Sequence, residues 1–199
     1  MARIADRAEQ GTRISAAVWR LMAEAGPQGL TLRAVAAAAG CTTGLVLHRF
    51  PDKRALLRHA RDLLHERTGA AMDELSGAGG SPAAVLRAVL RHAASVDPAK
   101  QQEARVWLGY LAAALGDDDL AERHRSANRA FLGRVDRLVG QVRPQWTKAR
   151  RATVSLSLVS LIEGMNTLAV ADPETYRPTR QLAVLDSTLA ALDLADPPA

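Results

Sequence analysis

Apolar residues recur at intervals of three and four along nearly the whole chain, and this spacing constrains the fold more than any other feature. Within residues 10–25, for example, Ile14, Val18, Leu21 and Met22 share one face of a helix. No segment shows sustained two-residue alternation, and aromatic residues, which favour strands, make up only 4% of the chain. The pattern therefore predicts an all-α protein with about nine helices.

Glycine, proline and capping residues divide this pattern into separate helices. Gly26-Pro27 should end the first helix, and Thr31 and Thr42 are expected to cap two short helices joined at Gly40. The glycine-rich segment 76–82 is the clearest linker. The expected helices are 10–25, 31–39, 42–49, 53–75, 82–95, 99–115, 118–141, 145–170 and 179–194.

The chain of 199 residues is long enough for one medium domain or two small ones, and its charge is unevenly distributed. Residues 1–60 contain nine arginines and lysines but only four acidic residues, whereas the rest of the chain has 17 of each. The whole formal charge of +5 therefore belongs to the first third. This asymmetry indicates a part that binds a polyanion, joined to a part with another task. A basic, solvated face explains the charge equally well.

Several chemistries lack their residues in this sequence. Cys41 is the only cysteine, which excludes an internal disulfide and argues against a cysteine zinc site. There is no glycine-rich phosphate loop, no His-Glu-x-x-His or Cys-x-x-Cys spacing and no Gly-x-Ser-x-Gly turn. His59 and His65 flank Asp62 on one helix, but a solvated charged face explains them better than a metal. We therefore expect neither an enzyme nor a cofactor or metal, with an all-helical enzyme as the rival class.

The sequence also predicts a cytoplasmic protein with no membrane partner. Its first residues, MARIADRAEQGTR, are polar and lack the apolar core of a signal peptide. No run approaches the roughly 18 apolar residues that a membrane span needs.

The two short helices, 31–39 and 42–49, are separated by a turn at Gly40-Cys41 and preceded by the helix 10–25. This order is that of a helix-turn-helix, in which the second helix enters the major groove of DNA. The pattern alone is a weak signal, because many helical hairpins share it.

Order and spacing within this segment add specificity. The residues concerned are Ile14 to Ala25, Gly26, Thr31-Leu32-Arg33, Val35-Ala36, Ala39-Gly40, Thr42, Gly44, His48, Phe50, Lys53 and Leu56-Leu57. Over about 50 residues the segment resembles the DNA-binding region of the TetR family of bacterial transcriptional repressors. One position departs from the family, because Leu47 stands where its members usually have a tyrosine that reaches a backbone phosphate.

The resemblance and the expected helix-turn-helix together indicate eight DNA contacts. Thr31 and Thr42 have helix capping as their alternative role, and Arg33 and His48 have a solvated surface position as theirs. Leu47 leaves three options: a lost phosphate contact, contact with a thymine methyl group, or inward packing. The eight candidates are Thr31, Arg33, Thr42, Thr43, Gly44, Leu47, His48 and Lys53.

The resemblance further implies that the C-terminal helices enclose a small-molecule effector and form a dimer through the last two long helices. The candidate ligand-binding residues are Trp107, Tyr110, Leu111, Phe131, Ile162, Glu163 and Asn166. The candidate dimer contacts are Leu158, Leu161, Leu182, Leu185 and Leu189. Ordinary core packing is the alternative for Trp107 and Phe131.

Glu163 is the most informative of these candidates because it interrupts the apolar run SLVSLIEGM. A carboxylate in such a run must be paired or must face a wet cavity or an interface. Near aromatic rings it would suit a cationic or amphipathic effector. A salt bridge to an arginine and a place at the dimer interface are equally open explanations.

We therefore expect a DNA-binding domain at residues 1–52 and an effector-binding and dimerisation domain at 53–199. The expected function is that of a ligand-responsive transcriptional regulator, most simply a repressor, that binds a palindromic double-stranded DNA operator as a homodimer. Effector binding would release it from DNA. The effector, the operator, the sign of regulation and the dimer-forming face are open at this stage. The alternative is a helical small-molecule-binding or interaction protein that retains a helix-turn-helix as a scaffold.

Overall fold

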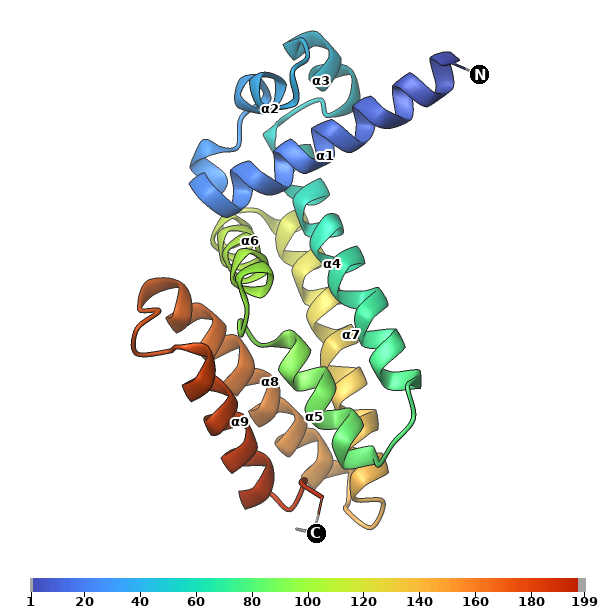
Figure 1. The fold of residues 1–199 in the computed structure, drawn as a ribbon, viewed down its shortest axis with the longest axis vertical. Coiled ribbons are helices and arrows are strands. Elements are labelled where there is room, and N and C mark those ends of the chain that lie inside the picture. Colours follow the sequence, from blue (N-terminus) through green and yellow to red (C-terminus); the bar gives the residue numbers. More distant parts are fainter. Residues whose placement is uncertain (1, 197–199) are drawn as a thin grey trace. The chain divides into compact units, whose positions relative to one another are not determined.

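The computed structural model describes residues 2–196, and within this range the chain forms nine α-helices and no strand (Figure 1). The all-α prediction is confirmed. The helices are α1 (Ala2–Gly29), α2 (Leu32–Ala39), α3 (Thr43–Arg49), α4 (Lys53–Gly77), α5 (Pro82–Ala93), α6 (Pro98–Ala114), α7 (Asp118–Val142), α8 (Lys148–Ala171) and α9 (Pro178–Ala191).

Most helix ends lie close to the predicted ones because local residues set them. Gly26 adopts φ 63° and ψ −166°, a conformation outside the helical region, so the regular first helix stops where expected before a last turn through Gly29. The clearest differences are that α1 begins at Ala2 rather than at residue 10, that α9 ends at Ala191 rather than at 194, and that α8 begins at Lys148 rather than at 145. Thr147 sets the latter start, because its side chain accepts a hydrogen bond from the amide of Arg150.

The helices divide into two compact units that do not follow the predicted boundary after residue 52. The first unit contains the chain up to Glu66 together with Arg105–His124, and the second contains Arg67–Ala104 together with the chain from Arg125 onward. The long helices α4, α6 and α7 therefore each contribute to both units.

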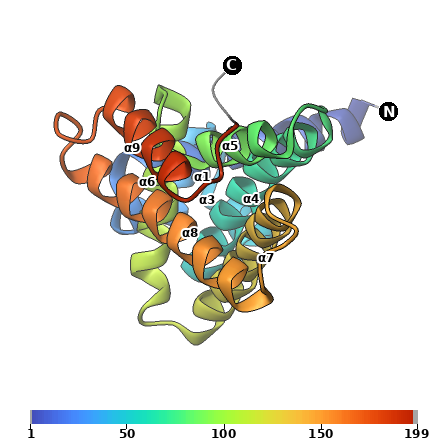
Figure 2. The same cartoon turned by 90° about the horizontal axis from the view of Figure 1, so that it is seen from below.

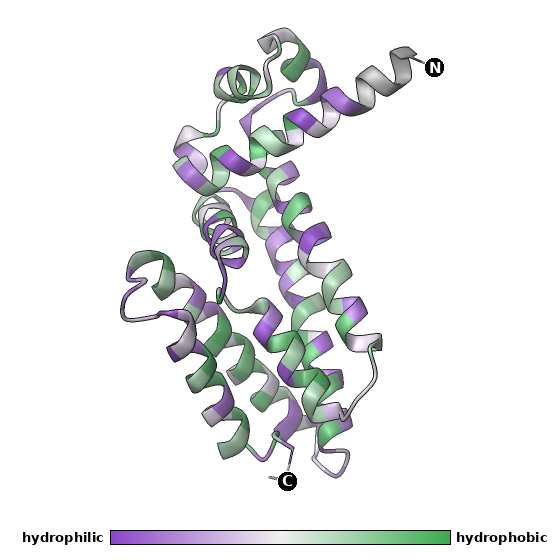
Figure 3. Ribbon diagram, viewed as in Figure 1, coloured by the Kyte–Doolittle hydropathy of each residue, from purple (hydrophilic) through white to green (hydrophobic). Residues whose placement is uncertain are grey.

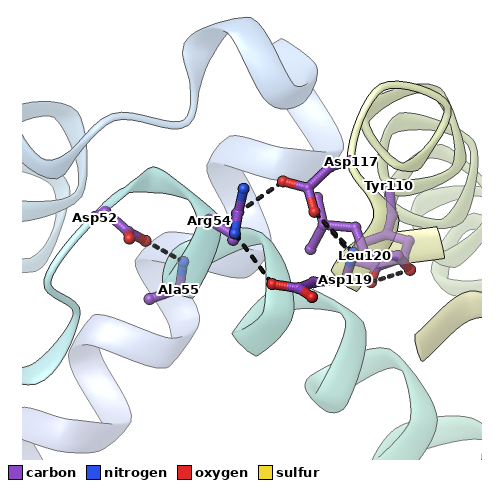
Figure 4. Close-up of polar contacts among 7 residues, drawn as sticks. All are labelled: Asp52, Arg54, Ala55, Tyr110, Asp117, Asp119 and Leu120. Atoms are coloured by element: carbon purple, nitrogen blue, oxygen red, sulfur yellow. Dashed lines mark hydrogen bonds and ion pairs between the residues drawn. The ribbon is translucent and has the colours of Figure 1, made fainter. Parts of the chain in front are cut away.

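The first unit has a core built from α1 to α4 and completed by α6 and the start of α7. Val106 and Tyr110 of α6 and Leu120 of α7 are buried in the same cluster as Val35 and Val46. The Tyr110 hydroxyl donates a hydrogen bond to the Leu120 carbonyl oxygen at 2.9 Å (Figure 4). The middle of α6 thus belongs to the same core as the helix-turn-helix.

Polar contacts fasten the start of α7 to the start of α4. Arg54 Nε lies 2.7 Å from a carboxylate oxygen of Asp117, and its Nη1 lies 3.0 Å from one of Asp119 (Figure 4). Asp117 also accepts hydrogen bonds from the amides of Asp119 and Leu120, as a capping residue does. These contacts join residues far apart in sequence, which is why periodicity did not place the domain boundary.

The second unit is a bundle whose core is lined by α4, α5, α7, α8 and α9. Helices α8 and α9 run side by side in opposite directions (Figures 1 and 2). Their apolar character is visible along both ribbons in Figure 3. Asn166 of α8 ties this bundle to the end of α5, because its Oδ1 accepts from the Ser95 amide at 2.8 Å and its Nδ2 donates to the Ala93 carbonyl at 2.9 Å.

Helix α8 is long and apolar enough to cross a membrane when length and composition alone are considered, which our sequence analysis did not expect. The core helix of a soluble protein meets the same criterion. Here Leu158, Val159, Ile162 and Met165 of α8 pack in the core of the second unit.

Candidate nucleic-acid interface

Helices α2 and α3 form the predicted helix-turn-helix, and neighbouring residues explain where each helix starts and where the turn between them lies. Thr31 and Thr42 cap α2 and α3, with their hydroxyls accepting from the amides of Ala34 at 3.1 Å and Leu45 at 3.3 Å. Gly40 ends α2 with φ 65° and ψ 39°, a left-handed conformation that suits glycine. The Cys41 amide then donates to the Ala36 carbonyl at 3.0 Å, which completes the tight turn.

One side of this motif is anchored in the core of the first unit. Val35 of α2 and Val46 of α3 are fully buried, and Phe50, which follows α3, is nearly so. Because these side chains fix the rotation of α3, its opposite side must face solvent. That side carries Thr43, Leu47 and His48, all of which are exposed.

All eight residues predicted to contact DNA are exposed on the first unit. They are Thr31, Arg33, Thr42, Thr43, Gly44, Leu47, His48 and Lys53. Leu47 keeps 49% of its surface exposed, so the structure removes the option that it packs inward. Thr31 and Thr42 do act as caps, as their alternative role proposed, and remain exposed at the starts of their helices.

The start of α4 adds a positively charged residue, Lys53, after the helix-turn-helix. Asp52 caps α4 by accepting from the Ala55 amide at 2.7 Å, and Lys53 is the first residue of the helix. A lysine and the free amides of a helix N-terminus attract the same anion, for which a DNA phosphate is suited.

A cluster at the C-terminal end of α3 was missed by the sequence analysis. Arg49 extends to α1, where its Nη1 would lie 2.5 Å from a Cβ placed on Gly11. The rings of Phe50 and His59 of α4 pack in a tilted arrangement, with centroids 4.9 Å apart and planes at 41°, and His59 Nε2 is hydrogen-bonded to the Ser15 hydroxyl at 2.9 Å. Burial first, and then the Arg49 charge, lower the pKa of His59. A glycine in the middle of an otherwise regular helix was the available signal.

The predicted ligand residues fall into the two units, and three of them belong to the first. Trp107 and Leu111 are half-buried, and Trp107 lies 6.4 Å from His124 between ring centroids. Tyr110 is fully buried, and its hydroxyl donates its one available hydrogen bond to the Leu120 carbonyl oxygen. Burial raises the pKa of Tyr110. The hydroxyl of Tyr110 is thus already used by the fold.

The other four predicted ligand residues belong to the second unit. Ile162 and Asn166 are buried, whereas Phe131 and Glu163 are half-buried. Asn166 uses its amide oxygen and nitrogen to hold the segment after α5, so a structural role accounts for this polar residue. The second unit also has a groove of about 410 Å³ between α5, α9 and residues 194–196, which none of the seven candidates lines.

The predicted dimer contacts require a correction. Leu158, Leu185 and Leu189 are buried within the core of their own chain, with at most 2% of their surfaces exposed, so they offer no face to a partner. Leu161 and Leu182 are half-buried. The error arose because α8 and α9 are apolar on more than one side, so periodicity did not separate the core side from the outer side. The exposed large apolar residues of these helices are Leu156, Leu168 and Val184.

Comparisons with known proteins agree with this architecture. The family of bacterial regulatory proteins named after tetR matches residues 14–60, and the C-terminal domain of the BetI-type transcriptional repressors matches residues 82–194. The HTH-type transcriptional regulator BetI of Burkholderia mallei is 30% identical over 152 residues, which cover 75% of this chain and 75% of that protein. The BetI regulator of Stenotrophomonas maltophilia is 28% identical over 150 residues, again 75% of each chain.

Solved structures show the same fold. A transcriptional regulator from Rhodococcus sp. Rha1 superimposes with a TM-score of 0.84 at 26% identity and covers 94% of this chain and 98% of its own. A regulator from Saccharomonospora viridis, solved in complex with choline, gives a TM-score of 0.83 at 14% identity, with 93% of this chain and 96% of its own covered. The chain therefore belongs to the TetR family of bacterial transcriptional regulators and carries the C-terminal domain of the BetI-type repressors.

Proposed function

We propose that this regulator binds a palindromic DNA operator as a homodimer, with α3 of each protomer in the major groove. The observation that carries the proposal is the exposure of all eight candidate contacts on a motif whose other side is anchored in the core. Thr43, Leu47 and His48 face base edges or phosphates in this arrangement, and Lys53 neutralises a phosphate beside the groove.

The test is a binding titration of the purified protein with the DNA upstream of its own gene, at several salt concentrations. Lys53→Ala should weaken binding to all sequences and reduce the slope of log K against log salt by about 0.9, the contribution of one phosphate contact. Lys148→Ala is the matched control, because Lys148 is likewise an exposed lysine at the first position of a long helix, but belongs to the second unit. A Lys53→Ala slope equal to that of the wild type excludes this phosphate contact. Absence of any sequence preference favours a helix-turn-helix kept only as a scaffold.

We further propose that the effector is a small organic cation that interacts with the second unit. Support comes from Glu163, a half-buried carboxylate in the apolar run SLVSLIEGM of α8, and from the choline complex of the structurally similar Saccharomonospora viridis regulator. Choline should raise the melting temperature and weaken operator binding, whereas its neutral isostere 3,3-dimethylbutan-1-ol should do neither. Glu163→Gln should remove the choline effect. Equal effects of the two compounds would exclude charge recognition.

The dimer is proposed to form through the outer sides of α8 and α9. Leu156 and Leu168 of α8 and Val184 of α9 are exposed, and small residues such as Ser160 and Ala183 are exposed beside them. An apolar, small-residue surface on two antiparallel helices suits a symmetric four-helix contact with a second copy. Since its family consists of transcriptional regulators, the protein is also proposed to act in the cytoplasm without catalytic activity.

A further inference from the structure

Two residues at the end of α3, Arg49 and Phe50, link the proposed reading helix to α1 and α4. Arg49 ends α3, and Gly11 of α1 is buried against its guanidinium group. A Cβ at position 11 would lie 2.5 Å from Arg49 Nη1 and 3.3 Å from Cζ, so an alanine there would displace the guanidinium group from this place. A glycine within a helix lowers helix stability relative to alanine, but at position 11 it leaves the space that the Arg49 guanidinium group occupies.

The second half of the cluster holds Phe50, the residue immediately after α3. The centroid of its ring lies 5.9 Å from Cζ of Arg49 and 4.9 Å from the ring centroid of His59 of α4. His59 is in turn hydrogen-bonded to Ser15, one helical turn after Gly11 on α1. Helices α1 and α4 therefore both grip the C-terminal end of the reading helix.

We propose that Gly11, Ser15 and His59 are positioning residues for DNA recognition, acting on the reading helix through Arg49 and Phe50. The proposal rests on the DNA binding proposed above. Gly11 provides the space in which Arg49 crosses α1, and the Ser15–His59 hydrogen bond fixes the ring against which Phe50 packs. Together they set the angle at which Thr43, Leu47 and His48 are presented.

The same contacts make the position of the reading helix sensitive to acid. Neutral His59 accommodates the nearby Arg49, whereas a protonated ring would place two cations beside Phe50. The charged groups that act on His59 are Arg49 of α3, which disfavours its protonation, and Asp62 and Glu66 of its own helix, which favour it. Burial and Arg49 prevail, so the pKa of His59 is lowered and the ring is neutral near pH 7.

The first experiment compares Gly11→Ala with Gly69→Ala, a glycine of α4 with open space around it. Alanine is the better helix former, so both changes should keep or raise the melting temperature. Only Gly11→Ala should weaken operator binding, by roughly fivefold or more, the lower end of typical coupling between two sites. In an Arg49→Ala background the same change should have no further effect. Unchanged affinity in Gly11→Ala, or a loss that persists without Arg49, overturns the role of Gly11.

The second experiment measures operator affinity of the wild type, Ser15→Ala and His59→Gln between pH 7.5 and 5.5. In the wild type, acidification protonates His59 beside Arg49 and should therefore weaken operator binding. His59→Gln removes this effect, so the ratio of its operator affinity at pH 5.5 to that at pH 7.5 should exceed the wild-type ratio, and Ser15→Ala should bind more weakly at pH 7.5. Identical pH profiles of wild type and His59→Gln overturn the role of His59. A wild type that binds no operator at any pH refutes the proposed function instead.

Discussion

The sharpest prediction concerns the dimer and follows from which leucines of α8 the fold has already buried. Leu156 keeps 54% of its surface exposed. Burying a whole leucine side chain contributes about 1.5–3 kcal/mol, so burying the remaining half contributes about 0.8–1.5 kcal/mol. A symmetric interface contains each residue twice, which makes about 1.5–3 kcal/mol per dimer. Leu156→Glu should therefore raise the dimer Kd by about 10- to 100-fold, at roughly 1.4 kcal/mol per factor of ten.

Sedimentation velocity across nanomolar to micromolar concentrations measures this Kd, and circular dichroism reports whether the protomer is folded. Leu156→Glu should remain helical, become monomeric at concentrations where the wild type is dimeric, and bind operator weakly, because two reading helices are no longer coupled. Leu115→Glu is the matched control, since Leu115 is 85% exposed and follows α6 rather than lying on α8 or α9. It should leave the dimer Kd unchanged.

Leu185 contrasts with Leu156, because the sequence indicated a dimer contact at Leu185 whereas the structure buries it in the core of its own chain. It is 1% exposed, so Leu185→Ala should cost about 2–5 kcal/mol of unfolding free energy through the cavity it leaves. Its effect on dimerisation should follow only from this loss of stability. The reasoning is refuted if Leu156→Glu dimerises like the wild type, or if the wild type itself is monomeric at micromolar concentration.

Three further predictions concern DNA affinity and stability. Leu47→Tyr should tighten specific and nonspecific DNA binding alike, by about 1 kcal/mol, because a phosphate contact carries no sequence information; a selective loss at the operator would instead indicate a thymine contact. Tyr110→Phe should lower the unfolding free energy by about 0.5–1.5 kcal/mol, since a buried hydrogen bond to the Leu120 carbonyl is lost, and should leave the response to effector intact; an effector response lost without loss of stability would contradict this. Burial first, and then the charge of Lys100, lower the pKa of His92 below its ordinary value of 6.5. The contribution of His92 to the free energy of unfolding should therefore be complete above pH 6.5 and lost as the pH falls through the folded pKa. Melting curves of His92→Gln should show a smaller acid-induced decrease in melting temperature than those of the wild type.

The helices and the reading motif were predictable because their causes are local. Thr31 and Thr42 cap the helices that follow them, and Gly26 and Gly40 adopt positive φ angles where turns were expected. Such causes can be recognised in a short stretch of sequence, because capping hydrogen bonds span only three or four residues and the preference for a positive φ belongs to a single residue. The order of motif residues between Ile14 and Leu57 then sufficed to indicate the family, which the comparisons confirm.

The roles of apolar and polar residues inside the bundle depended instead on contacts between distant segments. Periodicity treats Leu156 and Leu158 as members of one apolar helix, yet only Leu158 meets α5, α7 and α9 in the core of its own chain. Asn166 was a plausible ligand residue from the sequence, but in the structure its side-chain oxygen accepts a hydrogen bond from the Ser95 amide.

The domain boundary has the same explanation. Long helices are continuous in sequence, but α4, α6 and α7 each change unit part of the way along. Periodicity is the same on both sides of each change, because a helix buries one face whichever core it meets. What placed residues 105–124 with the helix-turn-helix were contacts across more than 60 residues, such as Arg54 with Asp117 and Asp119. The sequence alone therefore determined where helices form and which of them make up the helix-turn-helix, whereas the tertiary structure decided which faces are buried, since burial depends on partners that no local pattern specifies.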